Sequence, residues 1–126
     1  MRRLSRKRAA SLPDEQAFRA ELMERINHTC EWCGAEPACD KHEIGRGKFR
    51  ESCRMHWCAV LGLGPLCHGI LTRMPSDDAT IAGLAILRRS RPEDYSLEKF
   101  LELTTPHAPN RITEREVLAW SRRLAA

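Results

Sequence analysis

The chain has 126 residues, of which 42% are hydrophobic and 6% aromatic, and its formal net charge is +4. This length limits the protein to one domain, or to a compact nucleus with helical flanks. No apolar run approaches the ~18 residues of a membrane-spanning helix, and the arginine-rich start lacks the apolar stretch of a secretory signal. We therefore expect a cytoplasmic protein, of a bacterial or phage-infected cell, that has no membrane partner.

The N-terminal segment, residues 1–12, is predicted to be a basic, disordered arm. Its charges are all positive before the first acid, Asp14. Ser11 followed by Pro13 is typical of a helix start. Apolar residues at helical spacing then predict a helix over about residues 13–27, whose apolar stripe packs against the segment that follows. That stripe consists of Phe18, Leu22, Met23 and Ile26.

The middle of the chain, residues 29–60, has no helical period and is interrupted by glycines and a proline. Short strands and loops are the better interpretation. We predict a hairpin with one strand near Cys39–Ile44 and the other near Trp57–Leu63. The segment Leu66–Arg73 then predicts a short helix that is stopped by Pro75.

The C-terminal part, residues 76–126, is predicted to be a helical extension. Ser76 precedes a strongly apolar helix, with Ile81–Leu87 at its centre, that ends before Pro92. Helices of this kind normally bury their apolar residues, so we expect it to cover the nucleus.

Two shorter helices complete the extension. Ser96 can cap the first of them, and residues 104–110, with two prolines, form a linker. Thr113 and Glu116 have the spacing of a capping box, which predicts a last helix. The apolar face of that helix consists of Val117, Trp120 and Leu124.

Cysteines and histidines form the most informative pattern. Cys30 and Cys33 are separated by two residues, a spacing that lets both thiols bind one metal ion on a tight turn. Cys67 lies far along the chain and can complete the same site. A reducing compartment favours metal ligation over disulfides. His68 directly follows Cys67, and His42 lies nine residues after Cys33; the two histidines are expected to meet around a second centre.

Residues 28–74 resemble the HNH endonucleases, whose core is two strands and a helix around a catalytic metal. The resemblance rests on Cys30-x-x-Cys33, a histidine-bearing strand end, and Leu63-Gly64-Pro65-Leu66-Cys67-His68, and it is closest to phage-encoded members. It implies an α+β fold: a small ββα-metal, zinc-containing nucleus over residues 13–75, flanked by the N-terminal and C-terminal helices.

The resemblance implies a structural Zn²⁺ bound by Cys30, Cys33 and Cys67. Gly64 stands where the family has a fourth thiol, so another ligand must replace it. We favour Cys58, because a strand that precedes the turn can bring it beside Cys67. The other candidates are Cys53 and Cys39, for which a buried or incidental thiol is the alternative interpretation.

The resemblance also implies that His68 binds a catalytic ion, Mg²⁺ or another divalent cation. In one alignment His42 is a second ligand and Glu43 the general base. If the alignment is shifted by one residue, His42 is the general base and Asp40 is the metal ligand. Imidazole suits the base because its pKa lies near neutrality. A third interpretation makes His42 a zinc ligand or a neighbour of one.

One further family residue, an asparagine, is missing. Ala59 occupies its expected place, and His56 is near enough in sequence to substitute for it. The altered base and the missing asparagine bear on cleavage rather than on the fold.

The leading hypothesis for function is a metal-dependent endonuclease that hydrolyses DNA, with Arg46, Lys48 and Arg50 holding phosphates. The alternative is a catalytically degenerate, zinc-containing nucleic-acid-binding module, which the missing asparagine and thiol favour. A third hypothesis is a zinc-stapled interaction protein that exposes the apolar residues Ile81–Leu87 to a partner.

Overall fold

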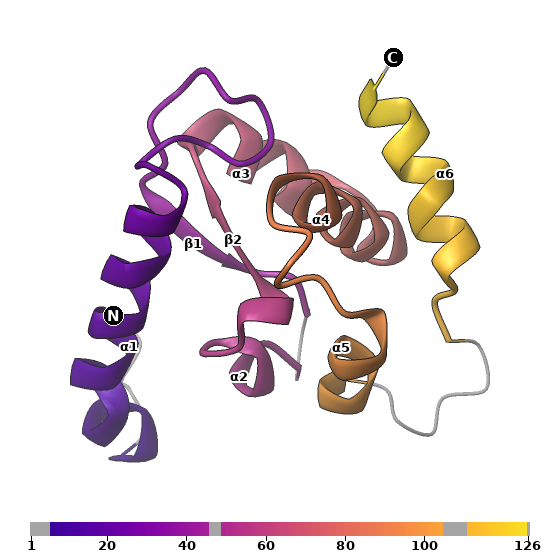
Figure 1. Ribbon diagram of the computed structural model, residues 1–126. Helices are drawn as coiled ribbons and strands as arrows, with labels where there is room; N and C mark the ends of the chain where they lie inside the picture. The colour runs from indigo at the N-terminus through magenta and orange to yellow at the C-terminus, as the bar shows by residue number, and fades with distance from the viewer. Residues whose placement is uncertain (1–5, 46–48, 105–110, 126) are drawn as a thin grey trace.

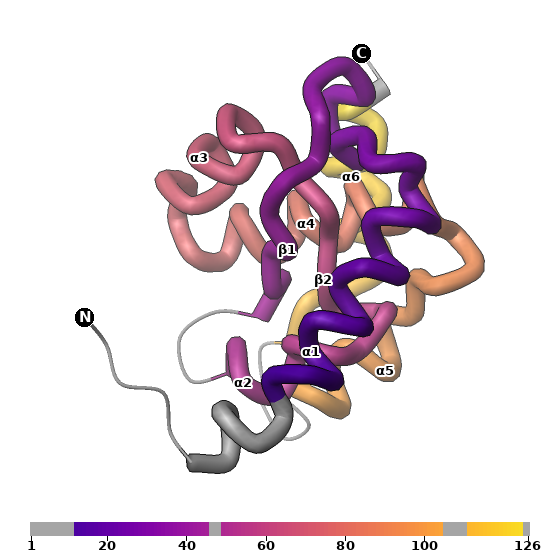
Figure 2. Tube along the Cα trace, turned by 90° about the vertical axis from the view of Figure 1, so that its left-hand side faces the viewer, coloured from indigo at the N-terminus to yellow at the C-terminus, as the bar shows by residue number. Residues whose placement is uncertain are grey.

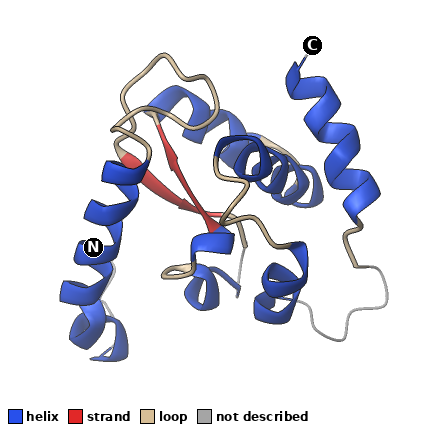
Figure 3. Cartoon of the chain, in the orientation of Figure 1, coloured by secondary structure: helices blue, strands red, loops and turns tan. Residues whose placement is uncertain are grey.

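The structure, a computed structural model, describes residues 6–45, 49–104 and 111–125. Within those ranges the fold is α+β, a two-stranded antiparallel sheet surrounded by helices, as expected (Figure 3). In chain order the elements are α1 (Arg6–Arg25), β1 (Asp40–Glu43), α2 (Arg50–Cys53), the 3-10 turn η2 (Trp57–Ala59), β2 (Val60–Leu63), α3 (Pro65–Arg73), α4 (Ser76–Ser90), α5 (Leu97–Thr104) and α6 (Glu114–Ala125).

The predicted hairpin is confirmed, with shorter strands. Asp40 pairs with Leu63 at one end of the sheet and Glu43 pairs with Val60 at the other. Every residue of β2 is buried, because helices cover the sheet on both sides. Helix α1 lies along one side, and α3 and α4 lie on the other (Figure 1; Figure 2).

Helix α1 begins at Arg6 and contains Pro13 within it, so the prediction of a disordered arm over residues 1–12 is wrong from Arg6 onward. Basic charge suggested disorder, but arginine, lysine and alanine are also strong helix formers. Residues 1–5 lie outside the described residues. Helix α1 is attached through an aromatic contact: the Phe18 and Trp57 ring centroids are 4.1 Å apart, and the Arg25 guanidinium lies 3.7 Å from the Trp57 centroid.

A single hydrophobic core runs from the hairpin into the C-terminal helices. The central residues of α4, Ile81–Leu87, are all buried, and most of them belong to this core. Gly83 permits a close approach, since a Cβ there would lie 3.2 Å from the Ile44 side chain. The apolar run therefore covers the nucleus, and the hypothesis that it is an exposed partner surface is wrong.

The N-termini of α5 and α6 are capped as predicted. Ser96 Oγ accepts a hydrogen bond from the Lys99 amide at 3.2 Å. Thr113 Oγ1 accepts one from the Glu116 amide at 3.3 Å, and the Glu116 carboxylate accepts the Thr113 amide at 3.1 Å, which completes the capping box. The predicted linker falls mostly on residues 105–110, outside the described residues. Among the described helices, none is long and apolar enough to cross a membrane.

A buried ion pair joins the cysteine turn to the end of α4. Glu31 lies between Cys30 and Cys33, and its carboxylate is 2.7 Å from Arg91 Nε. The other carboxylate oxygen accepts the Gly62 amide of β2 at 2.7 Å. Both side chains are almost completely buried, so loss of Arg91 would leave the Glu31 carboxylate as an uncompensated charge, at a cost of about 3–5 kcal/mol, whereas Arg91 has a second partner in Asp94 at 2.8 Å. The pair therefore fixes the turn against β2 and α4.

Candidate functional site

The turn that carries the first two thiols is closed by its own backbone. The Cys30 amide donates to the Glu36 carbonyl at 2.9 Å, and the Gly34 amide donates to the Cys30 carbonyl at 3.0 Å. Gly34 has a φ of 67°, a conformation that favours glycine. The turn brings Glu36 back beside Cys30.

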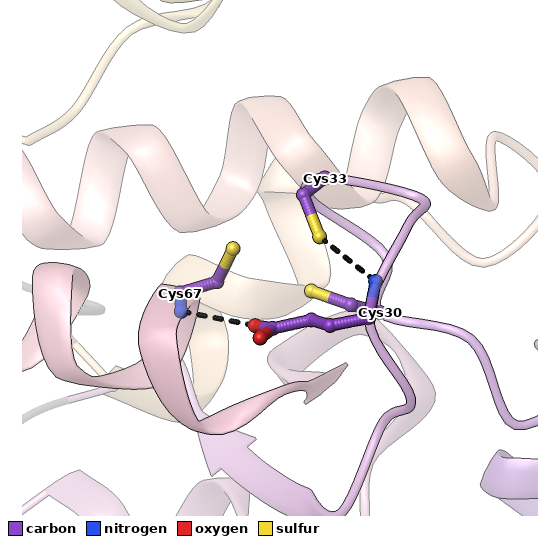
Figure 4. A group of neighbouring side chains, drawn as sticks. Cys30, Cys33 and Cys67 are labelled. Atoms are coloured by element: carbon purple, nitrogen blue, oxygen red, sulfur yellow. Dashed lines mark hydrogen bonds between the residues drawn. The ribbon is translucent and has the colours of Figure 1, made fainter.

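Four side chains gather where this turn meets the start of α3. They belong to Cys30, Cys33, Glu36 and Cys67, and one donor atom from each lies within 4.8 Å of the others. The three sulfur atoms converge in Figure 4. Cys30 and Cys67 are buried, whereas Cys33 is exposed. We call these four residues the cysteine centre. They lie close enough to bind a metal ion, and three thiolates with one carboxylate are donors compatible with zinc.

The thiols of the cysteine centre differ in acidity. Hydrogen bonds from the backbone amides of Glu36 and Ala35 to Cys33 Sγ lower the pKa of that thiol. Burial raises the pKa of Cys67, and the neighbouring Cys30 raises it further. A bound cation would oppose both effects on Cys67, because it favours thiolates outright.

Glu36 was not predicted from the sequence. Its Oε1 accepts a hydrogen bond from the Cys67 amide at 3.2 Å. A Cβ placed on Gly64 would lie 2.2 Å from the Glu36 carboxylate carbon, so the carboxylate fills the space of a side chain at that position. The sequence signal was only an acid three residues after Cys33, and it is weak by itself.

Cys58, the predicted fourth ligand, lies outside the cysteine centre. It is buried in the turn η2, before β2 begins, whereas Cys67 follows the other end of that strand. Four strand residues span roughly 13 Å, at about 3.3 Å each. The strand β2 therefore separates the Cys58 thiol from the Cys67 thiol. Cys53, buried in α2, and Cys39, which is exposed, are also outside the centre.

A second group of side chains lies between β1 and α3. The rings of His42 and His68 are 5.2 Å apart between centroids and meet edge to face. His68 Nδ1 is 3.1 Å from Asp40 Oδ2. Side chains alternate along a strand, so Asp40 and His42 share the face of β1 that α3 covers. We call these three residues the histidine site.

Glu43 lies on the opposite face of β1, toward α1. The Lys41 ammonium is 3.9 Å from the Glu43 carboxylate and 3.2 Å from that of Glu15 in α1. Both Lys41 and Glu43 side chains are largely buried in this ion-pair network. Asp40 thus lies with the two histidines, whereas Glu43 is paired with Lys41.

A surface cavity of about 350 Å³ opens beside the histidine site. It is polar, and α1 supplies one of its walls. Its lining consists of Leu12, Glu15, Gln16, Arg19, Asp40, Lys41, Glu43, Arg50 and His68. Of the predicted phosphate contacts, Arg50 lines the cavity, whereas Arg46 and Lys48 lie outside the described residues. His56 is exposed and is not among the lining residues, and Ala59 is completely buried.

The donors of the histidine site suit a divalent cation in kind, since carboxylate and imidazole both bind such ions. They are spaced more widely than the cysteine centre, which is the one set of three or more donors within 4.8 Å among the described residues. Comparison of this chain with known protein families, with curated proteins and with solved structures gave no match. The resemblance to the HNH endonucleases stays a prediction.

Proposed function

We propose that the protein is a metal-dependent endonuclease that hydrolyses DNA phosphodiester bonds at the histidine site. The observation that carries the proposal is the meeting of His42 from β1 with His68 from α3, 5.2 Å apart, beside a cavity that Arg50 also lines. The His68 imidazole, the Asp40 carboxylate and the Arg50 guanidinium line this cavity, and His42 reaches it only through its contact with His68. Imidazole, carboxylate and guanidinium are groups that phosphodiester hydrolysis uses.

In this proposal His42 takes the proton from the attacking water. Imidazole does so near neutral pH because its ordinary pKa lies there. The Asp40 carboxylate is hydrogen-bonded to Nδ1 of His68, so Nε2 is the ring nitrogen of His68 that is available to the substrate or to an ion. Arg50 binds a neighbouring phosphate and positions the strand. A divalent ion held by Asp40 and His68 would supply stabilisation of charge on the leaving oxygen.

The proposal includes a structural zinc ion at the thiolates of Cys30, Cys33 and Cys67. Structural zinc contributes apparent binding free energies of about 10–16 kcal/mol in small domains, all of it available to folding. Cys67 and His68 are adjacent on α3, so the ion would also hold the helix that presents His68. In this proposal zinc supports the fold and the imidazoles act on DNA.

The test is a nicking assay on supercoiled plasmid with magnesium, with manganese and without metal. The wild-type protein should nick only with a divalent metal, and His68→Ala should not nick. His56→Ala is the matched control, because His56 is exposed and does not line the cavity. Equal nicking by wild type and His68→Ala would show that the activity does not arise from this site.

The second candidate function is a nucleic-acid-binding module without turnover. Two observations favour it: Ala59 is buried where the resemblance implies an asparagine, and the histidine site is more widely spaced than the cysteine centre. DNA binding that weakens by roughly 0.9 log units per phosphate contact per log unit of salt, without nicking under any metal, would support this candidate. Arg50→Ala removes one phosphate contact, so it should reduce the slope of log affinity against log salt concentration by about 0.9.

A further inference from the structure

The cysteine centre has an oxygen donor where the resemblance implies a sulfur. We propose that Glu36 is the fourth metal ligand, and that position 64 is glycine because the Glu36 carboxylate occupies the volume of its side chain. The proposal rests on zinc binding by the three thiols, and not on nuclease activity.

The steric observation couples positions 36 and 64. A Cβ on Gly64 would lie 2.2 Å from both Cδ and Oε1 of Glu36, and 2.3 Å from Cγ. Carbon atoms of real side chains do not approach so closely, so a side chain at 64 and the present carboxylate exclude each other. A thiol at 64 and a carboxylate at 36 are thus alternative ways to fill one ligand position.

The turn positions Glu36 before any metal arrives. Its carbonyl accepts the Cys30 amide at 2.9 Å, and its own amide donates to Cys33 Sγ at 3.5 Å. The backbone of Glu36 is therefore fixed to the two thiols of the turn. A ligand held in this way loses little conformational entropy when it binds the ion.

Glu36 also acts at the start of α3. Gly64 precedes the helix and has no side chain with which to cap it, and the Cys67 amide instead donates to Glu36 Oε1 at 3.2 Å. A carboxylate at a helix N-terminus is favoured by the helix dipole. It has about four lone-pair positions, so this hydrogen bond leaves others for a cation. Capping alone is the competing explanation for Glu36.

A conservative variant separates the two explanations. Glu36→Gln keeps an oxygen that can accept the Cys67 amide, but a neutral amide is a poor zinc ligand. If Glu36 binds the metal, this variant should lower metal affinity by more than about 100-fold, beyond the roughly 10–100-fold that loss of a supporting hydrogen-bond partner costs. If Glu36 only caps α3, the affinity should change by less than about tenfold.

The experiment is a titration of the full chain with Co²⁺, followed by competition with Zn²⁺. Absorption from sulfur-to-cobalt charge transfer grows with the number of thiolate ligands. We expect a three-thiolate signal for wild type, the same signal with much weaker binding for Glu36→Gln, and tight binding with a stronger, four-thiolate signal for the double variant Glu36→Ala/Gly64→Cys. Glu93→Gln, an exposed acid outside the centre, is the control.

Each contrary result has a separate meaning. Tight binding by wild type together with a Glu36→Gln affinity within tenfold would overturn the role of Glu36 and leave the thiols as ligands. A double variant that gives no additional thiolate signal would overturn the coupling between positions 36 and 64. Wild-type protein that binds neither metal would overturn the zinc proposal itself. The nicking assay tests the histidine site separately, so it distinguishes failure of the Glu36 proposal from failure of the proposed nuclease activity.

Discussion

The cysteine centre and the histidine site lie next to each other along α3, yet they are built differently. The cysteine centre has four donors within 4.8 Å, with two of its thiols buried. The histidine site has three donors at wider spacing, and His68 faces a cavity of about 350 Å³. Closed, four-ligand arrangements are typical of structural metals, and open ones of chemistry.

The boundary between the two sites is one peptide bond. Cys67 and His68 are consecutive on α3, and a helix turns about 100° per residue, so neighbouring side chains face different directions. Cys67 faces the turn that carries Cys30, and His68 faces Asp40 of β1. A single short helix can therefore serve stability on one side and reactivity on another.

The largest effect should follow from breaking the cysteine centre. Cys30→Ser and Cys67→Ser should release zinc and abolish cooperative thermal unfolding, because about 10–16 kcal/mol of apparent metal-binding free energy is lost. Elemental analysis and melting curves measure both. Cys39→Ser is the control, since Cys39 is exposed and outside the centre. A Cys30→Ser protein that keeps one zinc ion and its melting transition would contradict this prediction.

Substitutions in the histidine site should abolish nicking without unfolding the protein. His42→Ala and His68→Ala should each lower the nicking rate by about 10²–10⁴-fold, the range that general acid–base groups contribute. Zinc content and the melting temperature should stay close to those of the wild type. Release of zinc by His68→Ala would instead make His68 a ligand of the structural ion, and would remove the distinction between the two sites.

A smaller effect separates the two alignments of the first strand. Asp40 is hydrogen-bonded to His68, whereas Glu43 is paired with Lys41 on the other face of β1. Asp40→Asn should therefore lower nicking by about 10²-fold, at the low end of acid–base contributions, and Glu43→Gln should retain most of the activity. The opposite ranking in the plasmid assay would make Glu43 the base and His42 a ligand.

The smallest predicted effect concerns a thiol that belongs to neither site. Burial raises the pKa of Cys53 to about 11 from 9.0. The folded protein thus keeps this proton where the unfolded chain loses it, so the contribution to stability is complete below pH 9 and is lost as pH rises through about 11. Relative to Cys53→Ala, the wild-type free energy of unfolding should fall by about 1.4 kcal/mol per pH unit in this interval, measured by urea denaturation. Parallel pH profiles would show that Cys53 is not responsible.

Local sequence signals predicted much of the fold. The hairpin, α3 and the caps at Ser96 and Thr113 follow from turn residues, apolar patterns and side chains that act on their own neighbours. The predicted helix over residues 13–27 is confirmed as far as Arg25, but the prediction failed for the first part of α1, where basic residues were interpreted as a disordered arm although their helix propensity is high. It also missed α2 and η2, which are too short to have a recognisable period.

The cysteine centre was predicted in part. Spacing brought Cys30 and Cys33 together, and the resemblance added Cys67, all of which the structure places in one group. The fourth donor could not be found from spacing, because it depends on which side chain enters the space beside Gly64. Cys58 was favoured because the strand before the turn was expected to bring it beside Cys67, but that strand places the two thiols at its opposite ends.

The buried pair of Glu31 and Arg91 has a consequence for protein engineering. A cassette of residues 13–75, the predicted nucleus, would take Glu31 into a new chain and leave Arg91 behind. The transplanted turn would then lose both side-chain partners of the Glu31 carboxylate, Arg91 and the Ser90 hydroxyl, and with them its attachment to α4. A portable form of this metal turn needs either α4 through Arg91, or a neutral residue in place of Glu31 that still accepts the Gly62 amide.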